Sequence, residues 1–294
     1  MKICDEFLNK IRTQLLSIIG NDNDLLEDIS KSISDDYYLT SIVNGLFLKI
    51  STFNNFHFTS LCNEIHLGNI EFKNQFLKPK LVFTYYSENI AIKLEERINA
   101  CSLGKNRDDF SICVNYNKSE LIERIKLISK VELDSKISLL TYSRNEKIFK
   151  YIGECEEYID TVLIEKCSRL AEICSNDELF LSHGDLIPSN ILSNENNYIF
   201  VDWEWAAYRS KTYDLVLFLL FSNMPYRILL DFENYFDKNS LLSAYLDSIV
   251  ISLHEIKNWK NEKIYIENKE NKINMWLLTL QKAVDLIENF NGST

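Results

Sequence analysis

The most informative part of this sequence is His183-Gly184-Asp185-Leu186-Ile187-Pro188-Ser189-Asn190, followed by Val201-Asp202-Trp203-Glu204. Asp185 and Asn190 stand five positions apart in the first segment, and Asp202 ends an apolar run in the second. Phosphoryl transfer from ATP needs a carboxylate that orients the attacking hydroxyl, and oxygen ligands that hold Mg²⁺ against the phosphates. A loop and the strand that follows it can supply both.

The spacing H-x-D-x-x-x-x-N is that of a kinase catalytic loop. It predicts Asp185 as the catalytic base or hydroxyl-orienting group, and Asn190 and Asp202 as ligands of Mg²⁺. The competing interpretation is structural: Asp and Asn are common turn formers, and Asp202 could cap the end of a strand.

The first hundred residues predict a small sheet with one packed helix. Two β-rich runs between Tyr37 and Ser51 flank Asn44-Gly45, which favours a hairpin with a type I′ turn. Residues 60–72 predict a helix, and residues 81–86 and 90–95 predict a second hairpin around a short Ser-Glu-Asn turn. A first amphipathic helix is predicted over residues 3–18 from its apolar spacing.

Beyond Arg97 the pattern becomes mostly helical, so we expect an N-terminal nucleotide-binding lobe over residues 1–97 and a C-terminal helical lobe with the catalytic loop and acceptor site over residues 98–294. Asn117 and Glu120 form a candidate capping box. The helices predicted in this part are residues 117–131, 153–174, 240–258 and 272–290, with short strands between 179 and 203.

The composition limits the classes of partner that we expect the protein to bind. A chain of 294 residues with 46% hydrophobic and 26% charged residues is typical of a soluble globular protein. Its net charge of -11 opposes binding to nucleic acid or anionic lipid and favours cationic partners. The N-terminus does not resemble a signal peptide, and the longest apolar run, Leu215 to Phe221, is too short to span a bilayer. We therefore expect a cytoplasmic protein; the oligomeric state stays open.

HGDLIPSNIL with VDWEWA resembles the active-site signature of the aminoglycoside phosphotransferase and choline kinase superfamily. Tyr213-Asp214-Leu215 is similar to a step that follows this signature, and residues 202–208, DWEWAAY, are most similar to the choline/ethanolamine kinase branch. The resemblance implies an α+β, bilobal, protein-kinase-like fold, with a small antiparallel β-sheet and one packed helix in the N-lobe and a larger, mainly helical C-lobe. It implies ATP and Mg²⁺ as cofactors.

The resemblance also implies roles for single residues. Asp185 would be the base, Asn190 and Asp202 would bind Mg²⁺, and Glu204 would lie near the metal or the substrate. His183 would brace the loop, and Asp214 would be a buried carboxylate at a helix start that supports it.

Lys49 lies on the second strand of the Asn44-Gly45 hairpin, and Glu64 lies on the following helix. A kinase requires such a Lys–Glu ion pair, so we expect Lys49 to contact both Glu64 and the ATP phosphates. The backbone at Glu95, Glu96 and Arg97 is expected to contact adenine. The phosphate-covering loop is expected at residues 32–36, a segment that contains no glycine, so the choice between ATP and GTP stays open.

The acceptor is expected to be a small cationic molecule that carries a hydroxyl, such as choline, ethanolamine or an aminoglycoside. Glu204, Trp203, Trp205 and Tyr208 are the candidates for its recognition, because aromatic faces beside a carboxylate suit a cation. Two other hypotheses remain. A protein kinase is disfavoured by Gly184 in place of Arg in the catalytic loop and by Trp-Glu in place of Phe-Gly after Asp202. A pseudokinase, a binding module with a relict site, is favoured by the missing glycines and disfavoured by the joint retention of Asp185, Asn190, Asp202 and Lys49.

Overall fold

A computed structural model of the chain describes residues 13–20, 23–35, 38–55, 57–68, 78–107, 109, 111–133, 139–173, 178–194, 197–222, 224–261 and 269–292. The chain forms two compact units, residues 1–100 with 199–205, and residues 101–198 with 206–294. The segment that carries Asp202 and Glu204 thus groups with the N-terminal part of the chain, whereas the sequence predicts two continuous lobes.

The first unit contains a four-stranded antiparallel sheet in the order β1-β2-β4-β3. Its strands are β1 (Leu39–Val43), β2 (Leu46–Thr52), β3 (Leu81–Tyr86) and β4 (Ile90–Glu96). Both predicted hairpins are confirmed. Asn44 and Gly45 have φ of 48° and 74°, and a type I′ turn requires positive φ at both of these positions.

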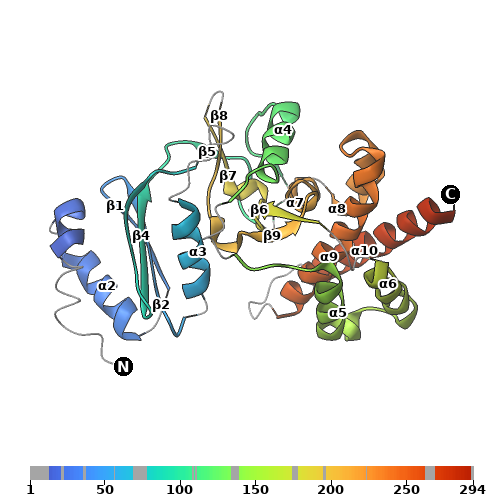
Figure 1. The fold of residues 1–294 in the computed structure, drawn as a ribbon, viewed down its shortest axis with the longest axis horizontal. Helices are drawn as coiled ribbons and strands as arrows, with labels where there is room; N and C mark the ends of the chain where they lie inside the picture. The colour runs from blue at the N-terminus through green and yellow to red at the C-terminus, as the bar shows by residue number, and fades with distance from the viewer. Residues whose placement is uncertain are drawn as a thin grey trace. The chain divides into compact units, whose positions relative to one another are not determined.

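Two helices cover the two faces of this sheet, α2 (Asn23–Asp35) and α3 (Phe58–Gly68) (Figure 1). The face toward α2 is apolar, and its buried residues include Leu25, Ile29 and Ile33 of the helix and Leu48 and Ile92 of the strands. On the other face, Leu61 and Ile65 of α3 pack on Ala91. Lys49, Lys93 and Glu95 also lie on that second face, and they carry part of the candidate site.

One prediction for this unit is wrong, and two others are confirmed where the structure describes them. Residues 32–35, expected in a phosphate-covering loop, form the last turn of α2, because Leu25, Ile29 and Ile33 recur at helical spacing and are buried against the sheet. Asp36 lies outside the described residues, and the predicted helix over 3–18 is described only at residues 13–19, which are helical. The predicted helix over 60–72 is α3, whose described part begins earlier, at Phe58.

Short strands frame the catalytic-loop segment in the second unit. Strand β6 (Leu179–Ser182) pairs antiparallel with β9 (Ala207–Ser210), and β5 (Cys101–Ser102) pairs antiparallel with β7 (Ile191–Asn194). Strand β8 (Asn197–Phe200) carries the chain from the second unit into the first. The segment His183 to Asn190 therefore lies between two short, fixed strands.

Helices make up most of the rest of the second unit (Figure 1). They are α4 (Lys118–Ile128), α5 (Arg144–Cys155), α6 (Thr161–Ile173), α7 (Tyr213–Phe221), α8 (Pro225–Ile228), α9 (Lys238–Asn261) and α10 (Lys269–Gly292), with 3-10 turns at Glu156–Tyr158, Pro188–Asn190 and Leu229–Asn234. Trp276 of α10 is fully buried and contacts Phe221 of α7.

The helix predictions for the C-terminal third are confirmed by α9 and α10, and Asn117 caps α4 by accepting from the N–H of Glu120. The single helix predicted over residues 153–174 is wrong. Helix α5 ends at Cys155, and α6 begins after Asp160, whose side chain accepts from the N–H of Leu163 and so caps the new helix.

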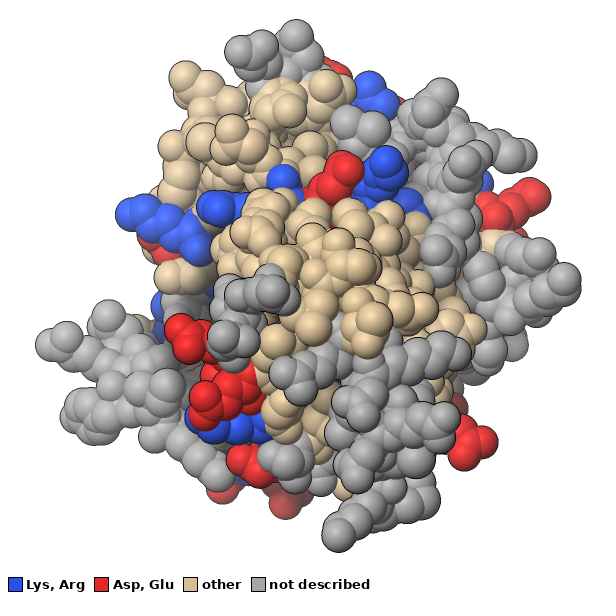
Figure 2. All heavy atoms as spheres, turned by 90° about the vertical axis from the view of Figure 1, so that its left-hand side faces the viewer, with Lys and Arg blue, Asp and Glu red and all other residues tan. Residues whose placement is uncertain are grey.

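Within the described residues, no helix is long and apolar enough to cross a bilayer. On the face drawn in Figure 2, the Lys and Arg side chains lie among Asp and Glu side chains, with other residues between them. The described part of this face thus carries charges of both signs.

Candidate active site

Lys49 is the centre of a charged cluster in the first unit. Its Nζ lies 2.9 Å from Oε2 of Glu64, 2.6 Å from Oδ1 of Asp202 and 2.8 Å from Oε1 of Glu204. Burial alone would lower the pKa of Lys49, but the three carboxylates outweigh it and raise the pKa well above its ordinary value. The predicted Lys49–Glu64 pair is therefore present, and Lys49 is held as a cation.

Glu64 is shared between two lysines. Lys93, opposite Lys49 in the register of β2 and β4, places its Nζ 2.7 Å from Oε1 of Glu64 and 2.7 Å from Glu95. Burial would raise the pKa of Glu64, but Lys49 and Lys93 lower it to about 2. The pKa of Glu95 is raised, first by burial. Glu64 is thus a fixed carboxylate that aligns Lys49.

Asp202 follows β8 with φ of 67°, in the left-handed region. Among the residues that the structure describes, Asn44 and Asp202 are the non-glycine residues with positive φ, and Asn44 lies in a turn that requires it. Backbone of this kind costs energy in a non-glycine residue, and such residues cluster at turns and at active sites. Here it turns the Asp202 carboxylate toward Lys49.

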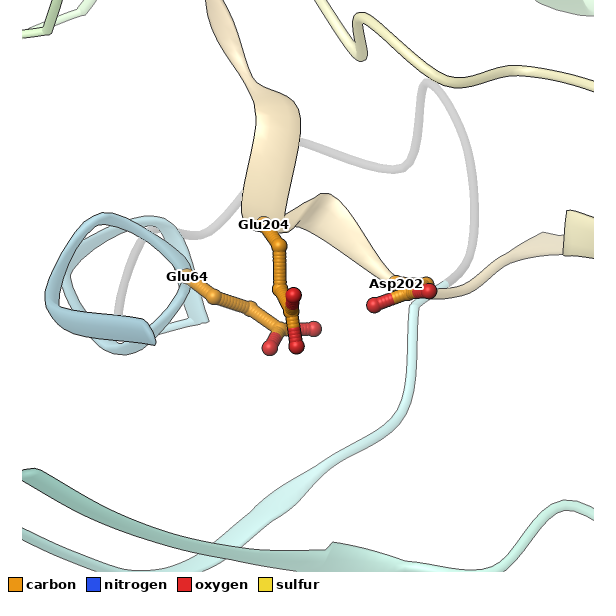
Figure 3. Close-up of side chains that lie close together, drawn as sticks. All are labelled: Glu64, Asp202 and Glu204. Atoms are coloured by element: carbon orange, nitrogen blue, oxygen red, sulfur yellow. The ribbon is translucent and has the colours of Figure 1, made fainter. Parts of the chain in front are cut away.

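The carboxylates of Glu64, Asp202 and Glu204 converge from α3 and from the segment after β8 (Figure 3). Each offers one oxygen, and these oxygens lie within 4.8 Å of one another. Hard oxygen ligands of this kind suit Mg²⁺. The side chains of Glu64 and Glu204 are 3% and 7% exposed, whereas that of Asp202 is 41% exposed, so Asp202 is the one that an ion can reach.

The pKa of Asp202 is raised, because its carboxylate is partly removed from water and lies beside Glu64 and Glu204. Asp202, Glu64, Glu204 and Glu95 bring four negative charges to this cluster, whereas Lys49 and Lys93 bring two positive ones. The excess of negative charge fits a divalent cation, so the residues present fit the magnesium that the sequence predicts.

Glu204 is held inside the first unit. Besides Lys49, its carboxylate accepts from the hydroxyl of Tyr38 and lies 3.4 Å from Nδ1 of His57. Tyr38 and His57 stack with ring centroids 4.4 Å apart. Glu204 therefore supports Lys49 and lies beside the candidate metal ligands.

Of the two tryptophans beside Glu204, Trp203 is a core residue. It is buried, its backbone N–H donates to Oε1 of Glu64 at 3.1 Å, and its Nε1 donates to the carbonyl of Phe200 at 2.9 Å. Trp203 thus offers no open aromatic face to an acceptor, contrary to the sequence expectation. Trp205 is 36% exposed, and Tyr208 lies half-buried on β9 in the second unit.

The adenine prediction stays a prediction, although two of the backbone donors that it names are already used. The side chain of Glu95 is buried against Lys93, and the backbone N–H groups of Glu96 and Arg97 already donate to the carbonyls of Lys80 and Gly45. A base cannot take these donors without breaking the edge of the sheet.

In the second unit, Asp214 ties down the start of the catalytic-loop segment. Its buried carboxylate accepts from Oγ of Ser182 at 2.9 Å, from the N–H of His183 at 2.7 Å and from the N–H of Gly184 at 3.0 Å. Gly184 has φ of 83°, where a side chain would be strained. Asp214 thus stands at the start of α7 and supports the loop, as the resemblance implies.

Asp185 is held by Asn190. The amide Nδ2 of Asn190 donates to the carbonyl of Asp185 at 2.8 Å and to its Oδ2 at 3.0 Å. Both bonds are made by the amide nitrogen, so the amide oxygen of Asn190 is not used to hold Asp185. His183 is fully buried, and its Nδ1 accepts from the N–H of Asp185 at 3.4 Å. The five-residue spacing therefore produces a closed, self-supporting loop.

Two further residues at this loop escape sequence analysis. Arg107 places Nη1 2.5 Å from Oδ1 of Asp185 and Nη2 2.6 Å from Oε1 of Glu255. Burial would raise the pKa of Glu255, but Arg107 lowers it to about 2. No short motif joins Arg107 and Glu255, whereas Lys93 had a signal: the alternation in IAIKLEE places Lys93 and Glu95 on one face of a strand.

Comparisons with known proteins identify the family of this chain. Residues 111–290, more than half of the 294-residue chain, match the family described as choline/ethanolamine kinase. The LicA homolog of Mycoplasma capricolum subsp. capricolum is 26% identical over 145 residues, which are 47% of this chain and 52% of that protein. The chain therefore spans about half the length of this curated relative.

Solved structures with a similar fold include a choline kinase from Cryptosporidium parvum Iowa II, with 14% identity, a TM-score of 0.55, and 91% of this chain and 97% of that chain covered. A choline/ethanolamine kinase family protein from Mesorhizobium loti has 10% identity and a TM-score of 0.58, with 85% and 89% covered. The ADP-bound aminoglycoside phosphotransferase APH(2'')-Ib has 14% identity and a TM-score of 0.54, with 90% and 99% covered. The predicted α+β, bilobal, protein-kinase-like fold is thereby confirmed.

Proposed function

This chain belongs to the choline/ethanolamine kinase family, and we propose that it transfers the γ-phosphoryl group of ATP to a hydroxyl of a small cationic molecule. The observation that carries the proposal is the cluster around Lys49. A buried Lys paired with a helix Glu, beside a carboxylate that solvent can reach, is the arrangement that kinases use for phosphates and metal. Because the donor is ATP, we place the reaction in the cytoplasm.

The chemistry divides among a few residues. Asp185, oriented by Asn190, accepts the hydrogen bond of the acceptor's hydroxyl and takes its proton as the phosphoryl group moves. Asp202 and the amide oxygen of Asn190 would hold Mg²⁺. When bound, the metal neutralises charge on the phosphate oxygens.

Lys49 and the backbone after β4 bind the nucleotide. Lys49 exchanges its contact with Asp202 for the phosphates, while Glu64, fixed by Lys93, keeps Lys49 in place. For adenine we propose the backbone of residues 98–100, which follows β4 after Arg97. This segment replaces Glu95–Arg97, whose donors are used inside the sheet.

The acceptor is a hydroxyl-bearing amine or quaternary ammonium. The support is the net charge of -11, which raises the local concentration of cations, together with the exposed aromatic side chain of Trp205 and the half-buried one of Tyr208. We leave Trp203 out of this role, because it is buried and bonded within the first unit.

A panel assay tests the proposal. Release of ADP from MgATP is measured with choline, ethanolamine, gentamicin, streptomycin and a neutral sugar as acceptors; gentamicin and streptomycin are bound in complexes of the structurally similar APH(2'')-IIa. We expect ADP release that depends on at least one amine acceptor. Turnover of the neutral sugar alone would contradict the cationic acceptor. Binding of MgATP with no turnover of any acceptor would favour the pseudokinase hypothesis instead.

A further inference from the structure

Arg107 joins the catalytic loop to helix α9 of the second unit. Its Nη1 lies 2.5 Å from Oδ1 of Asp185, while Nη2 and Nε lie 2.6 Å and 3.4 Å from the two oxygens of Glu255. The guanidinium carbon lies 4.9 Å from the centroid of the Phe221 ring. One side chain thus contacts an acidic residue of the loop, an acidic residue of α9 and an aromatic residue of α7.

Glu255 explains why Arg107 stays there. The residue is 1% exposed, and its described partners besides Arg107 are His254 and Asn258. A buried carboxylate that loses its cation is costly, because its charge is left without compensation. Arg107 meets both Glu255 oxygens with Nε and Nη2, so the fork of the guanidinium leaves Nη1 for Asp185.

The segment that carries Arg107 is itself fixed to the loop. The N–H groups of Leu103 and Gly104 donate to the carbonyls of Ile191 and Pro188. The hydroxyl of Ser102 donates to the carbonyl of Ser189 at 3.0 Å. Arg107 therefore approaches Asp185 from a segment that moves with the loop.

We propose that Arg107 is a positioning residue of the reaction: anchored by Glu255 and Phe221, it holds Oδ1 of Asp185 while Asn190 holds Oδ2. Each oxygen keeps a further lone pair, so the acceptor's hydroxyl can still donate to Asp185. The inference rests on the proposed function, because it concerns the orientation of the carboxylate that receives the hydroxyl. Fixing that carboxylate from both sides sets the direction from which the hydroxyl must approach.

The alternative is that Arg107 merely fills the place of a cationic acceptor and leaves when the acceptor binds. The two accounts predict effects on different kinetic constants. A positioning residue raises kcat, whereas an occupant that must be displaced raises the KM of the acceptor. Arg107 contacts both oxygens of the fully buried Glu255, and this favours the positioning role. If a cationic acceptor displaced Arg107, the guanidinium would lose its contacts with Glu255 as well as its contact with Asp185.

The test compares R107A, R107K and the double variant R107A/E255Q with the wild-type chain. It measures kcat, the KM of acceptor and ATP, and the urea midpoint of unfolding. R107A should lower kcat roughly 10²-fold, the usual effect of a misplaced reactive group, and should lower the midpoint. R107A/E255Q removes both buried charges, so the midpoint should recover while kcat stays low. R107K keeps the charge without the fork and should also show a low kcat. R124A, at an Arg on the surface of α4, is the matched control and should match the wild type.

Guanidinium ion added at low millimolar concentration should restore part of the kcat of R107A and leave R124A unchanged. Recovery of kcat in R107A/E255Q would reduce Arg107 to a structural role and overturn the proposal. So would a lower acceptor KM in R107A with guanidinium acting as a competitor of the acceptor, which is the result expected of an occupant. A wild type without phosphoryl transfer would contradict the proposed function itself, a result distinct from both.

Discussion

Lys49 shows how one buried cation organises a site at the scale of single residues. Three carboxylates meet its ammonium, yet they differ in access: Glu64 and Glu204 are enclosed, and Asp202 faces water. The enclosed pair fixes the position of Lys49, which leaves Asp202 as the ligand that can exchange Lys49 for a metal ion. The left-handed backbone at Asp202 is consistent with that role, because its strain is retained where a side chain must point in one direction.

The substitution Asp202→Ala tests whether Asp202 is the ligand that binds the metal ion. The change deletes a charged ligand, so we expect Mg²⁺-dependent binding of ATP to fall below detection in titration calorimetry, while the fold is kept. Asp231→Ala, at an exposed Asp in the second unit, is the control and should bind as the wild type does. Intact MgATP binding by Asp202→Ala would remove Asp202 from the metal site.

The lowered pKa of Glu64 leads to a second prediction, which concerns how the free energy of unfolding depends on pH. Its value in the folded chain, about 2, lies below its ordinary value, so Glu64 contributes stability that is present above pH 4.5 and is lost as the pH falls toward 2. Glu64→Gln should therefore lower the free energy of unfolding at pH 7, by up to about 3–5 kcal/mol. Between pH 5 and 2 it should also reduce the pH dependence of that free energy.

Urea unfolding at several pH values measures both effects. Glu96→Gln, which changes an exposed carboxylate on the same sheet, controls for the loss of a charge as such. If Glu64→Gln keeps the full pH dependence of the wild type, the ion pairs of Glu64 with Lys49 and Lys93 contribute nothing to stability.

At the scale of elements, the catalytic loop depends on the close approach of two chain segments. A Cβ on Gly104 would lie 2.8 Å from Cβ of Pro188 and 3.3 Å from the backbone that follows. The contacting atoms belong to the proline ring and to the main chain of the turn, and neither can rotate away from the new Cβ. The segment before Arg107 and the turn Pro188–Asn190 therefore fit together only with glycine at this position.

Gly104→Ala should displace the turn Pro188–Asn190, which carries the amide that holds Asp185. We expect a fall in kcat of roughly 10-fold to 10²-fold with a loss of about 1–3 kcal/mol in stability, as for other overpacked sites. Gly153→Ala is the matched control, because nothing lies within 4 Å of the new Cβ and the site is helical. It should stabilise the chain by about 0.5–1 kcal/mol and leave kcat unchanged. Equal kcat values for the two variants would contradict this account.

A structural feature can be predicted from the sequence most easily when the residues that determine it are neighbours in the chain. The Asn44-Gly45 hairpin and the cap at Asn117 were predictable, because neighbouring residues determine them. The Lys49–Glu64 pair was predictable because a known reaction requires it. The last turn of helix α2, residues 32–35, is predicted wrongly as a loop, although the apolar spacing that ends at Ile33 was present, because a phosphate-covering loop was expected there. Arg107 and Glu255 lie 148 positions apart, and only the packing of α9 brings them together.

At the scale of the whole molecule, the chain is acidic, with a net charge of -11, while Figure 2 shows both signs side by side on one face. Net charge acts at long range and is screened by salt, with a Debye length of about 30 Å at 0.01 M and about 8 Å at 0.15 M ionic strength. The excess of acidic groups therefore attracts cations most strongly at low salt.

If the acceptor is a cation, its KM should rise severalfold between about 0.01 M and 0.15 M ionic strength at saturating MgATP, with kcat nearly unchanged. Initial rates at the two ionic strengths give this ratio, and a neutral solute such as sucrose at equal osmolarity controls for effects unrelated to charge. An acceptor KM that does not respond to salt would show that the acceptor is recognised by something other than its charge.

The most direct test of the proposed chemistry follows the phosphorus atom itself. Phosphorus NMR of the chain with MgATP and the best acceptor of the panel should show ADP together with a new phosphomonoester resonance of the acceptor. Asp185→Asn keeps the shape of the loop but lacks the carboxylate, so it should form this product on the order of 10²–10⁴ times more slowly. Formation of ADP and inorganic phosphate without a phosphomonoester, or equal rates for the wild type and Asp185→Asn, would contradict the account.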